Sequence, residues 1–225
     1  MSRALVYCGF LHQPEISLPR AGVSSAEVRV MAEREMRLLW SEVEWPFTPE
    51  QMQKNAVEFH GVVHHVFRQA AVVPFRLLSV FEDEKAMATF TAENVDAFIA
   101  DLERLKDFVQ MECVVYPAPG RTQANSSSGA EYLREKAGML RIIEQHVNDV
   151  RERLGALAHE IRVRETKNGT RIFVLTERGR ESEFRSTIER IVVPEQLARR
   201  MSGPWPAAEF LSERVRAPNI AADAK

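Results

Sequence analysis

The segment 203–211 constrains the fold of this chain most strongly, because it reads Gly-Pro-Trp-Pro-Ala-Ala-Glu-Phe-Leu. Pro204 and Pro206 lack a backbone N–H and fix their own φ, so no helix can run through them and no central strand can hold both. The segment is therefore extended and presents Trp205 between two stiff residues. We expect this tryptophan to pack either at the seam between two parts of the chain or on a partner protein.

The composition is that of a globular protein with a sizeable core. The chain has 225 residues, of which 45% are hydrophobic, and its formal net charge is -2. A chain of this length forms one large domain or two small ones. The near-neutral charge gives no global attraction to nucleic acid or to a membrane surface, so we expect neither as a partner.

Cysteine usage and hydropathy both favour a cytoplasmic protein. The two cysteines, Cys8 and Cys113, lie in apolar, strand-like runs, so we expect buried, reduced thiols. The N-terminus lacks the long apolar stretch of a secretion signal. No run of residues approaches the roughly 18 apolar residues that a membrane span needs.

The first half of the chain predicts strands and two helices. Strands are expected over about 4–11, 27–31, 37–43, 72–80 and 111–116, because these stretches are apolar or alternate with a period of two. Helices are expected over about 49–71 and 84–105, with Thr48 and Asp83 as their N-caps. We expect Pro74 and Arg76 to lie on a strand at the centre of this half.

The second half predicts a long helix over about 129–158, strands over 160–165 and 171–176, a helix over 180–191 and a strand over 196–201. The order of elements indicates an α+β fold of two ferredoxin-like halves, each a mostly antiparallel sheet with helices on one face. The segment before the long helix is rich in Pro, Gly and Ser and marks a boundary. We expect an N-terminal domain 1–117, a linker 118–128, a C-terminal domain 129–202, and a terminal segment and tail 203–225.

The long helix carries a short heptad pattern. Leu140, Val147 and Leu154 are spaced by seven residues, and so are Ile143, Val150 and Leu157. The pattern is shorter than the three or more heptads that a stable coiled coil needs, so it favours packing of the helix on its own sheet. The alternative is a coiled-coil oligomer, and the same pattern allows weak self-association.

The residue pattern predicts neither catalysis nor a metal site. His60 and His64 are four residues apart, as paired metal ligands are, but 61–63 lacks the glutamate of a zinc-protease motif and no third ligand follows. The chain has no phosphate-binding glycine loop and no nucleophile elbow. We therefore expect no catalytic residue, cofactor or metal. The alternative is a small-ligand-binding or enzymatic domain on a ferredoxin-like scaffold, which a polar pocket around His60 and His64 would favour.

Four stretches together resemble the GvpL/GvpF family of gas vesicle accessory proteins. They are 5–9, 60–63 with 72–76, 128–133 and 203–206, and the last resembles the family's terminal Gly-Pro-Trp-Pro-Pro-Tyr-Ser-Phe signature. The chain departs from the family pattern at Leu77 and Leu78 and at 207–209, which suggests a different partner preference. The signature residues that the resemblance marks for partner binding or structure are Pro74, Arg76, Tyr132, Leu133, Gly203, Pro204, Trp205, Pro206 and Phe210.

The resemblance implies a role in the assembly of gas vesicles. Members of the family are thought to help the small hydrophobic shell protein nucleate the vesicle wall or add to it. We therefore expect a cytoplasmic accessory protein associated with gas vesicles, whose partners are the shell protein and other gas vesicle accessory proteins. A shell protein with a large exposed apolar face aggregates unless it is covered, and an aromatic segment with an open sheet edge can cover it.

Overall fold

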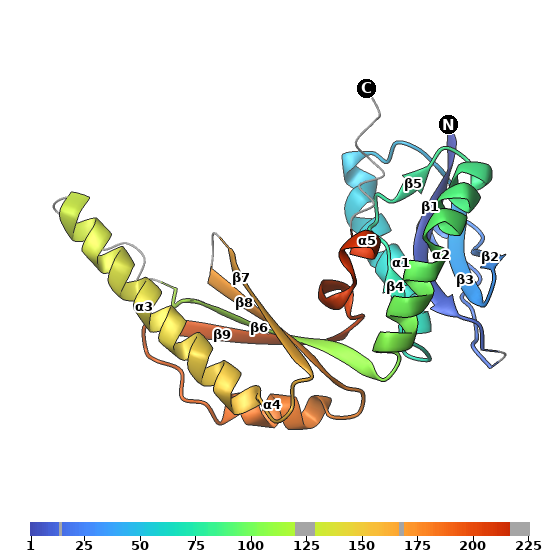
Figure 1. The fold of residues 1–225 in the computed structure, drawn as a ribbon. Coiled ribbons are helices and arrows are strands. Elements are labelled where there is room, and N and C mark those ends of the chain that lie inside the picture. The colour runs from blue at the N-terminus through green and yellow to red at the C-terminus, as the bar shows by residue number, and fades with distance from the viewer. Residues whose placement is uncertain (14, 120–128, 167–168, 217–225) are drawn as a thin grey trace. The chain divides into compact units, whose positions relative to one another are not determined.

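The chain divides into two compact units, and the first of them is built from an N-terminal and a C-terminal segment. The computed structural model describes residues 1–13, 15–119, 129–166 and 169–216. One unit consists of Met1–Asp107 with Pro206–Lys225, and the other of Phe108–Trp205 (Figure 1). The chain therefore passes between the units twice, after Asp107 and after Trp205.

The first unit is an antiparallel sheet with two long helices. Its strands run in the order β2-β3-β1-β4, and β5 also pairs with β1. The elements of this unit are β1 (Ser2–Leu11), the 3-10 turn η1 (Val23–Ser25), β2 (Arg29–Glu33), β3 (Met36–Glu44), α1 (Pro49–Phe67), β4 (Val73–Pro74), β5 (Val80–Phe81), α2 (Glu84–Leu105), the 3-10 turn η2 (Ala208–Phe210) and α5 (Glu213–Arg216).

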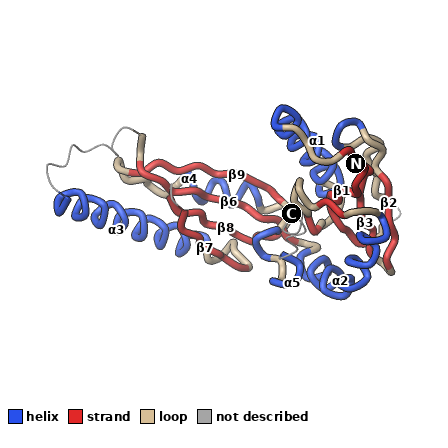
Figure 2. The backbone as a smooth tube through the Cα atoms, turned by 90° about the horizontal axis from the view of Figure 1, so that it is seen from above, coloured by secondary structure: helices blue, strands red, loops and turns tan. Residues whose placement is uncertain are grey.

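Strand β1 is the centre of the first unit. Residues 4–10 of this strand are all buried, so both of its faces are covered, whereas the sequence led us to expect helices on one face. Tyr7 packs on Phe59 of α1, with ring centroids 5.2 Å apart, and the Tyr7 hydroxyl accepts a hydrogen bond from the Val23 N–H at 2.9 Å. Phe81 of β5 packs on Phe90 of α2, also at 5.2 Å. Figure 2 shows α1 and α2 on the two sides of this sheet.

The predicted N-caps start both helices of this unit. The Gln51 side chain of α1 accepts a hydrogen bond from the Thr48 N–H at 2.9 Å, and Pro49 is the first helical residue. At α2, the Asp83 carboxylate accepts from the Ala86 N–H at 2.7 Å. These contacts satisfy backbone donors that a helix start leaves without an intrahelical partner.

The prediction of a continuous strand over 72–80 is wrong. Only Val73–Pro74 and Val80–Phe81 are in strands, and β4 lies at the edge of the sheet. Arg76 lies on the surface in the intervening turn, where its N–H donates to the Ser79 hydroxyl at 3.1 Å and its carbonyl accepts from the Ser79 N–H at 2.8 Å. Both backbone groups of Arg76, its N–H and its carbonyl, are bonded to Ser79 within the turn and cannot pair with a neighbouring strand. Arg76 is therefore not on a central strand.

The second unit is a four-stranded antiparallel sheet with two helices. The strand order is β7-β8-β6-β9. The predicted turn between β7 and β8 includes residues 167–168, which lie outside the described residues. The elements are β6 (Phe108–Pro117), α3 (Gly129–Leu154), β7 (Glu160–Thr166), β8 (Gly169–Glu177), α4 (Glu181–Glu189) and β9 (Leu197–Trp205).

The boundary between the units differs from the one expected at 118–128. Strand β6 pairs with β8 and β9, so the second unit begins at Phe108 rather than after the Pro/Gly/Ser-rich segment. Most of that segment, 120–128, lies outside the described residues. The expected separate tail is also divided, because Gly203 to Trp205 complete β9 and Pro206 onward belongs to the first unit.

Helices α3 and α4 cover one face of the second sheet. Val147 and Val150 of α3 and Phe184 of α4 are buried against Met111 and Val174 of the sheet. The heptad residues of α3 thus pack on the chain's own sheet as predicted, apart from Leu140, which is 54% exposed.

Both cysteines are buried free thiols. Cys8 lies in β1 and Cys113 in β6, and burial raises the pKa of each thiol to about 12. Among the described residues, the helices are too short or too polar to cross a membrane.

A buried carboxylate holds the C-terminal segment in the first unit. Asp101 of α2 accepts hydrogen bonds from the Ser212 N–H at 2.8 Å and the Ser212 hydroxyl at 2.9 Å, and it pairs with Arg104 at 2.6 Å. Arg104 also donates to the Phe210 carbonyl at 2.7 Å, and the Phe210 side chain is fully buried. The segment after Pro206 is therefore part of the core of this unit.

We predict that Asp101→Asn lowers the free energy of unfolding of the first unit by about 2 kcal/mol, because it removes the charge of a buried carboxylate that accepts hydrogen bonds from Ser212 and from the 44% exposed Arg104. The control is Glu103→Gln, whose carboxylate is 55% exposed and pairs with Lys106 at 3.4 Å, and which should change stability by less than about 1 kcal/mol. Urea denaturation followed by circular dichroism measures both. Equal stability of the two variants would contradict this role of Asp101.

Candidate functional site

The Gly-Pro-Trp part of the terminal signature forms the end of β9. Gly203 has φ +111°, and a Cβ atom there would lie 2.9 Å from the Gln110 carbonyl oxygen and 2.9 Å from the Met111 sulfur. Only glycine suits both this backbone conformation and this close approach. Strand β9 is an edge strand, which is why it tolerates Pro204 despite the missing N–H.

Trp205 is tied to its own sheet by a chain of hydrogen bonds. Its indole N–H donates to the Ser202 hydroxyl at 3.1 Å, and that hydroxyl donates to the Glu112 carboxylate at 3.2 Å. Arg171 of β8 donates to the other Glu112 oxygen, so the network joins β9, β6 and β8. Trp205 itself is half-buried. These groups hold one another in place, and the Glu112 carboxylate is shared between Ser202 and Arg171.

The signature residues do not form one site. Gly203, Pro204 and Trp205 are on β9 of the second unit, whereas Pro206 and Phe210 are in the first unit. The others are dispersed: Pro74 pairs with Cys8 at the sheet edge, Arg76 is in an exposed turn, and Leu133 is 64% exposed on α3. Tyr132 is on α3, but its side chain lies outside those that the structure describes.

The histidines of α1 form a stacked pair rather than a ligand set. The His60 and His64 rings are 5.7 Å apart and nearly parallel. Burial, followed by the charges of His60 and Arg68, lowers the pKa of His64, which favours its neutral form. His65 lies 3.1 Å from the Ser17 carbonyl and anchors a loop. Among the described residues, no group of three His, Cys, Asp or Glu side chains could hold a metal ion.

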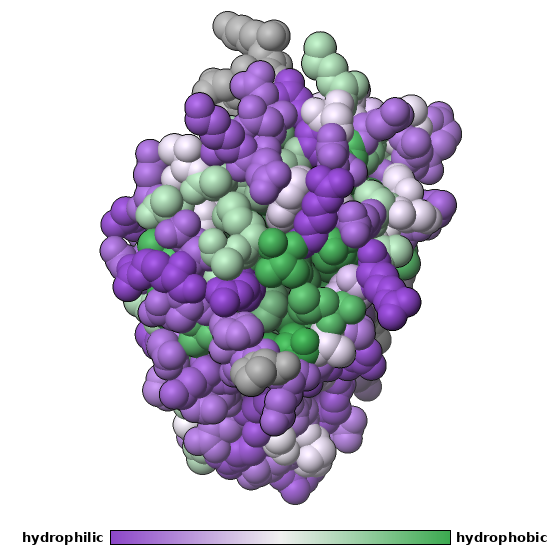
Figure 3. All heavy atoms as spheres, turned by 90° about the vertical axis from the view of Figure 1, so that its right-hand side faces the viewer, coloured by the Kyte–Doolittle hydropathy of each residue, from purple (hydrophilic) through white to green (hydrophobic). Residues whose placement is uncertain are grey.

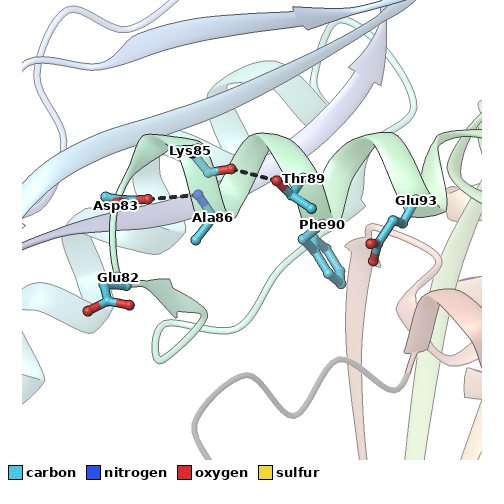
Figure 4. A pocket seen from close by; sticks show the side chains of 7 residues that line it. All are labelled: Glu82, Asp83, Lys85, Ala86, Thr89, Phe90 and Glu93. Atoms are coloured by element: carbon cyan, nitrogen blue, oxygen red, sulfur yellow. Dashed lines mark hydrogen bonds between the residues drawn. The ribbon is translucent and has the colours of Figure 1, made fainter.

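A shallow pocket lies along the start of α2. Figure 4 shows that two of its polar groups serve the helix itself: Asp83 caps the Ala86 N–H, and the Thr89 hydroxyl donates to the Lys85 carbonyl at 3.0 Å. The arrangement offers no converging acid and base. The pocket is lined by Glu82, Asp83, Lys85, Ala86, Thr89, Phe90 and Glu93.

The free edge of the first sheet is a better candidate for binding. Strand β2 is the last strand in the sheet order, and Val30 on it is 44% exposed. Ala32 on the same strand is exposed, and Met31 is half-buried. Figure 3 views the side of the first unit on which β2 lies and shows hydrophobic residues gathered near its centre.

Two functional features escaped the sequence reasoning. One is the contact of Asp101 with Ser212. The sequence holds a hint of it, because Asp101 lies next to Phe98 and Leu102 on the apolar face of the helix, where a carboxylate needs a hydrogen-bond donor. The other is the pairing of Glu112 with Ser202, which depends on the register of β6 and β9. Spacing within one segment does not reveal such a register.

We predict that Gly203→Ala lowers the free energy of unfolding by roughly 1–3 kcal/mol, since it forces a side chain into a strained backbone position against Gln110. Gly138→Ala is the matched control, because nothing lies within 4 Å of its Cβ position inside α3. That substitution should stabilise the protein by about 0.5–1 kcal/mol. Chemical denaturation measures both changes, and the same sign for the two would refute this reading of Gly203.

Comparison with known proteins identifies related proteins over nearly the whole chain. The family model described as "Gas vesicle synthesis protein GvpL/GvpF" matches residues 4–212. The crystal structure of GvpF from Anabaena sp. PCC7120 has a TM-score of 0.77 at 17% sequence identity, covering 94% of this chain and 97% of that one. GvpF from Microcystis aeruginosa has a TM-score of 0.70 at 12% identity, covering 93% and 99%. No curated protein matches the sequence.

The predicted fold class is confirmed by these likenesses, since the two antiparallel sheets packed with helices match solved GvpF structures. At such low identity the structural likeness shows the fold alone. The family match rests on the sequence itself and spans both units. The chain therefore belongs to the GvpL/GvpF family of gas vesicle synthesis proteins.

Proposed function

We propose that this protein is a cytoplasmic accessory protein that binds the small hydrophobic shell protein and assists nucleation or growth of the gas vesicle wall. The observation that carries the proposal is the family match over residues 4–212. Other gas vesicle accessory proteins are further partners in this scheme. The role is one of holding and delivering a protein, and it requires no catalysis.

The edge of β2 supports a holding role. The outer side of an edge strand presents backbone N–H and C=O groups that can pair with an added strand, and an apolar side chain beside them gives further contact. Val30 supplies that apolar contact. Arg29, which lies over the Trp40 ring at 5.2 Å and pairs with Glu42 at 3.3 Å, places a charge next to it. Such charges limit uncontrolled pairing of edges between copies.

The enzymatic alternative has less support. The pocket along α2 is lined by groups that cap or brace the helix, and His60 is stacked on His64. An active site instead needs a nucleophile or base whose partners leave it directed at a substrate. The described residues provide surfaces rather than such a constellation.

We predict that Val30→Lys reduces capture of the shell protein several-fold, because it places a charge on the apolar part of the edge. Val57→Lys is the control, since Val57 is a 70% exposed valine on α1 of the same unit. The test is co-expression of the full chain with the shell protein, followed by affinity capture and quantification of soluble shell protein.

This experiment tests the proposed function and the proposed binding surface separately. If the unaltered protein neither captures the shell protein nor keeps it soluble, the proposed function is wrong. If it does so and Val30→Lys behaves as Val57→Lys does, the function stands and the β2 edge is not the binding surface.

A further inference from the structure

The face of the second sheet opposite α3 and α4 has an ordered arrangement of side chains. The antiparallel register aligns residues of β9, β6, β8 and β7 in transverse rows. Residues of the helix-covered core, such as Met111 and Val174, alternate with those of this second face. Three successive rows on the second face are Arg200, Val114, Arg171, Arg164; then Ser202, Glu112, Phe173, Arg162; then Trp205, Gln110, Leu175, Glu160.

The first of these rows, which we name the arginine row, gathers positive charge. Arg164 on β7 lies directly opposite Arg171 on β8, and Arg200 on β9 lies across Val114 from Arg171. Like charges directly opposite each other on neighbouring strands destabilise a sheet. Protection of an edge suits the charges on β7 and β9, whereas Arg171 on the interior strand β8 is held by its ion pair with Glu112.

The next row holds the guanidinium groups of the arginine row in place and adds no net charge, because it contains one glutamate and one arginine. Phe173 is buried, and the guanidinium carbons of Arg171 and Arg164 lie 5.0 Å and 5.8 Å from its ring centroid. The Glu112 carboxylate, only 9% exposed, is bonded to Arg171 and Ser202. Arg162 of this row is paired with Glu160 at 2.7 Å, so the exposed positive charge of the face lies in the arginine row, where Arg164 and Arg200 are exposed.

We propose that the arginine row is a docking surface for an acidic segment of a protein partner, one that carries several carboxylates. Guanidinium groups bind carboxylates through paired N–H···O bonds, and the negative charges of such a segment complement the three positive charges of the row. Contacts to Phe173 hold both guanidinium groups over the face before a partner arrives. A nucleic acid is disfavoured, because Phe173 is buried beneath arginines and cannot serve as a stacking platform for bases.

This surface lies in the second unit and the β2 edge in the first, so the inference stands apart from the proposed function. Its test uses the full chain and a short fluorescein-labelled peptide of alternating glutamate and alanine, with a glutamine peptide as the uncharged match. The face variant combines Arg164→Glu with Arg200→Glu. The control combines Arg134→Glu with Arg151→Glu, which makes the same change of charge at exposed positions of α3.

We expect the unaltered protein to prefer the glutamate peptide, with an affinity that weakens as salt is added. The face variant should lose about tenfold or more in affinity, whereas the control variant should keep most of it, with both folded by circular dichroism. The proposal is overturned if the glutamate peptide does not bind at low salt, or if the face and control variants lose affinity equally. It is also overturned if single-stranded polyuridylate binds more tightly than the peptide and depends on the same two arginines.

Discussion

The buried carboxylate of Asp101 holds the C-terminal segment of this chain on helix α2. It binds Ser212 and Arg104, and through Arg104 it also fixes the Phe210 carbonyl. Within the first unit, these bonds hold the segment after Pro206 on α2. Within the second unit, Gly203 packs against Gln110 where a side chain would not fit. The terminal signature is thus anchored in both units, and Pro206 begins the part that belongs to the first.

This arrangement separates the role of the terminal signature from the roles that we propose for the exposed surfaces. Trp205 is bonded to Ser202 and half-buried, which suits a residue that completes a sheet. The surfaces that we propose for partners lie elsewhere, at the β2 edge around Val30 and at the arginine row. In this proposal, separate surfaces bind an apolar shell protein and an acidic segment.

Local signals in the sequence predicted most of the elements but not how they pair. Thr48 and Asp83 started their helices as expected, because capping depends on residues close in sequence. The assignment of β6 to the first domain failed, since an apolar run does not reveal which sheet it joins. Arg76 was predicted to lie on a strand because its neighbours in the sequence are apolar. In the structure it lies in a turn that the Ser79 hydroxyl stabilises. The predicted signature residues do not form one site, because a sequence motif does not show which distant residues come together. Asp101 and Ser212, for example, lie far apart in the sequence and are in contact only in the folded chain.

The most direct test of the account is Trp205→Ala, with urea unfolding and shell-protein binding measured on the same preparation. The account predicts that the free energy of unfolding falls by roughly 2 kcal/mol or more, because a half-buried indole and its hydrogen bond to Ser202 are lost. Binding of the shell protein per folded molecule should stay unchanged. Normal stability together with lost binding would contradict the account and would place Trp205 on the partner.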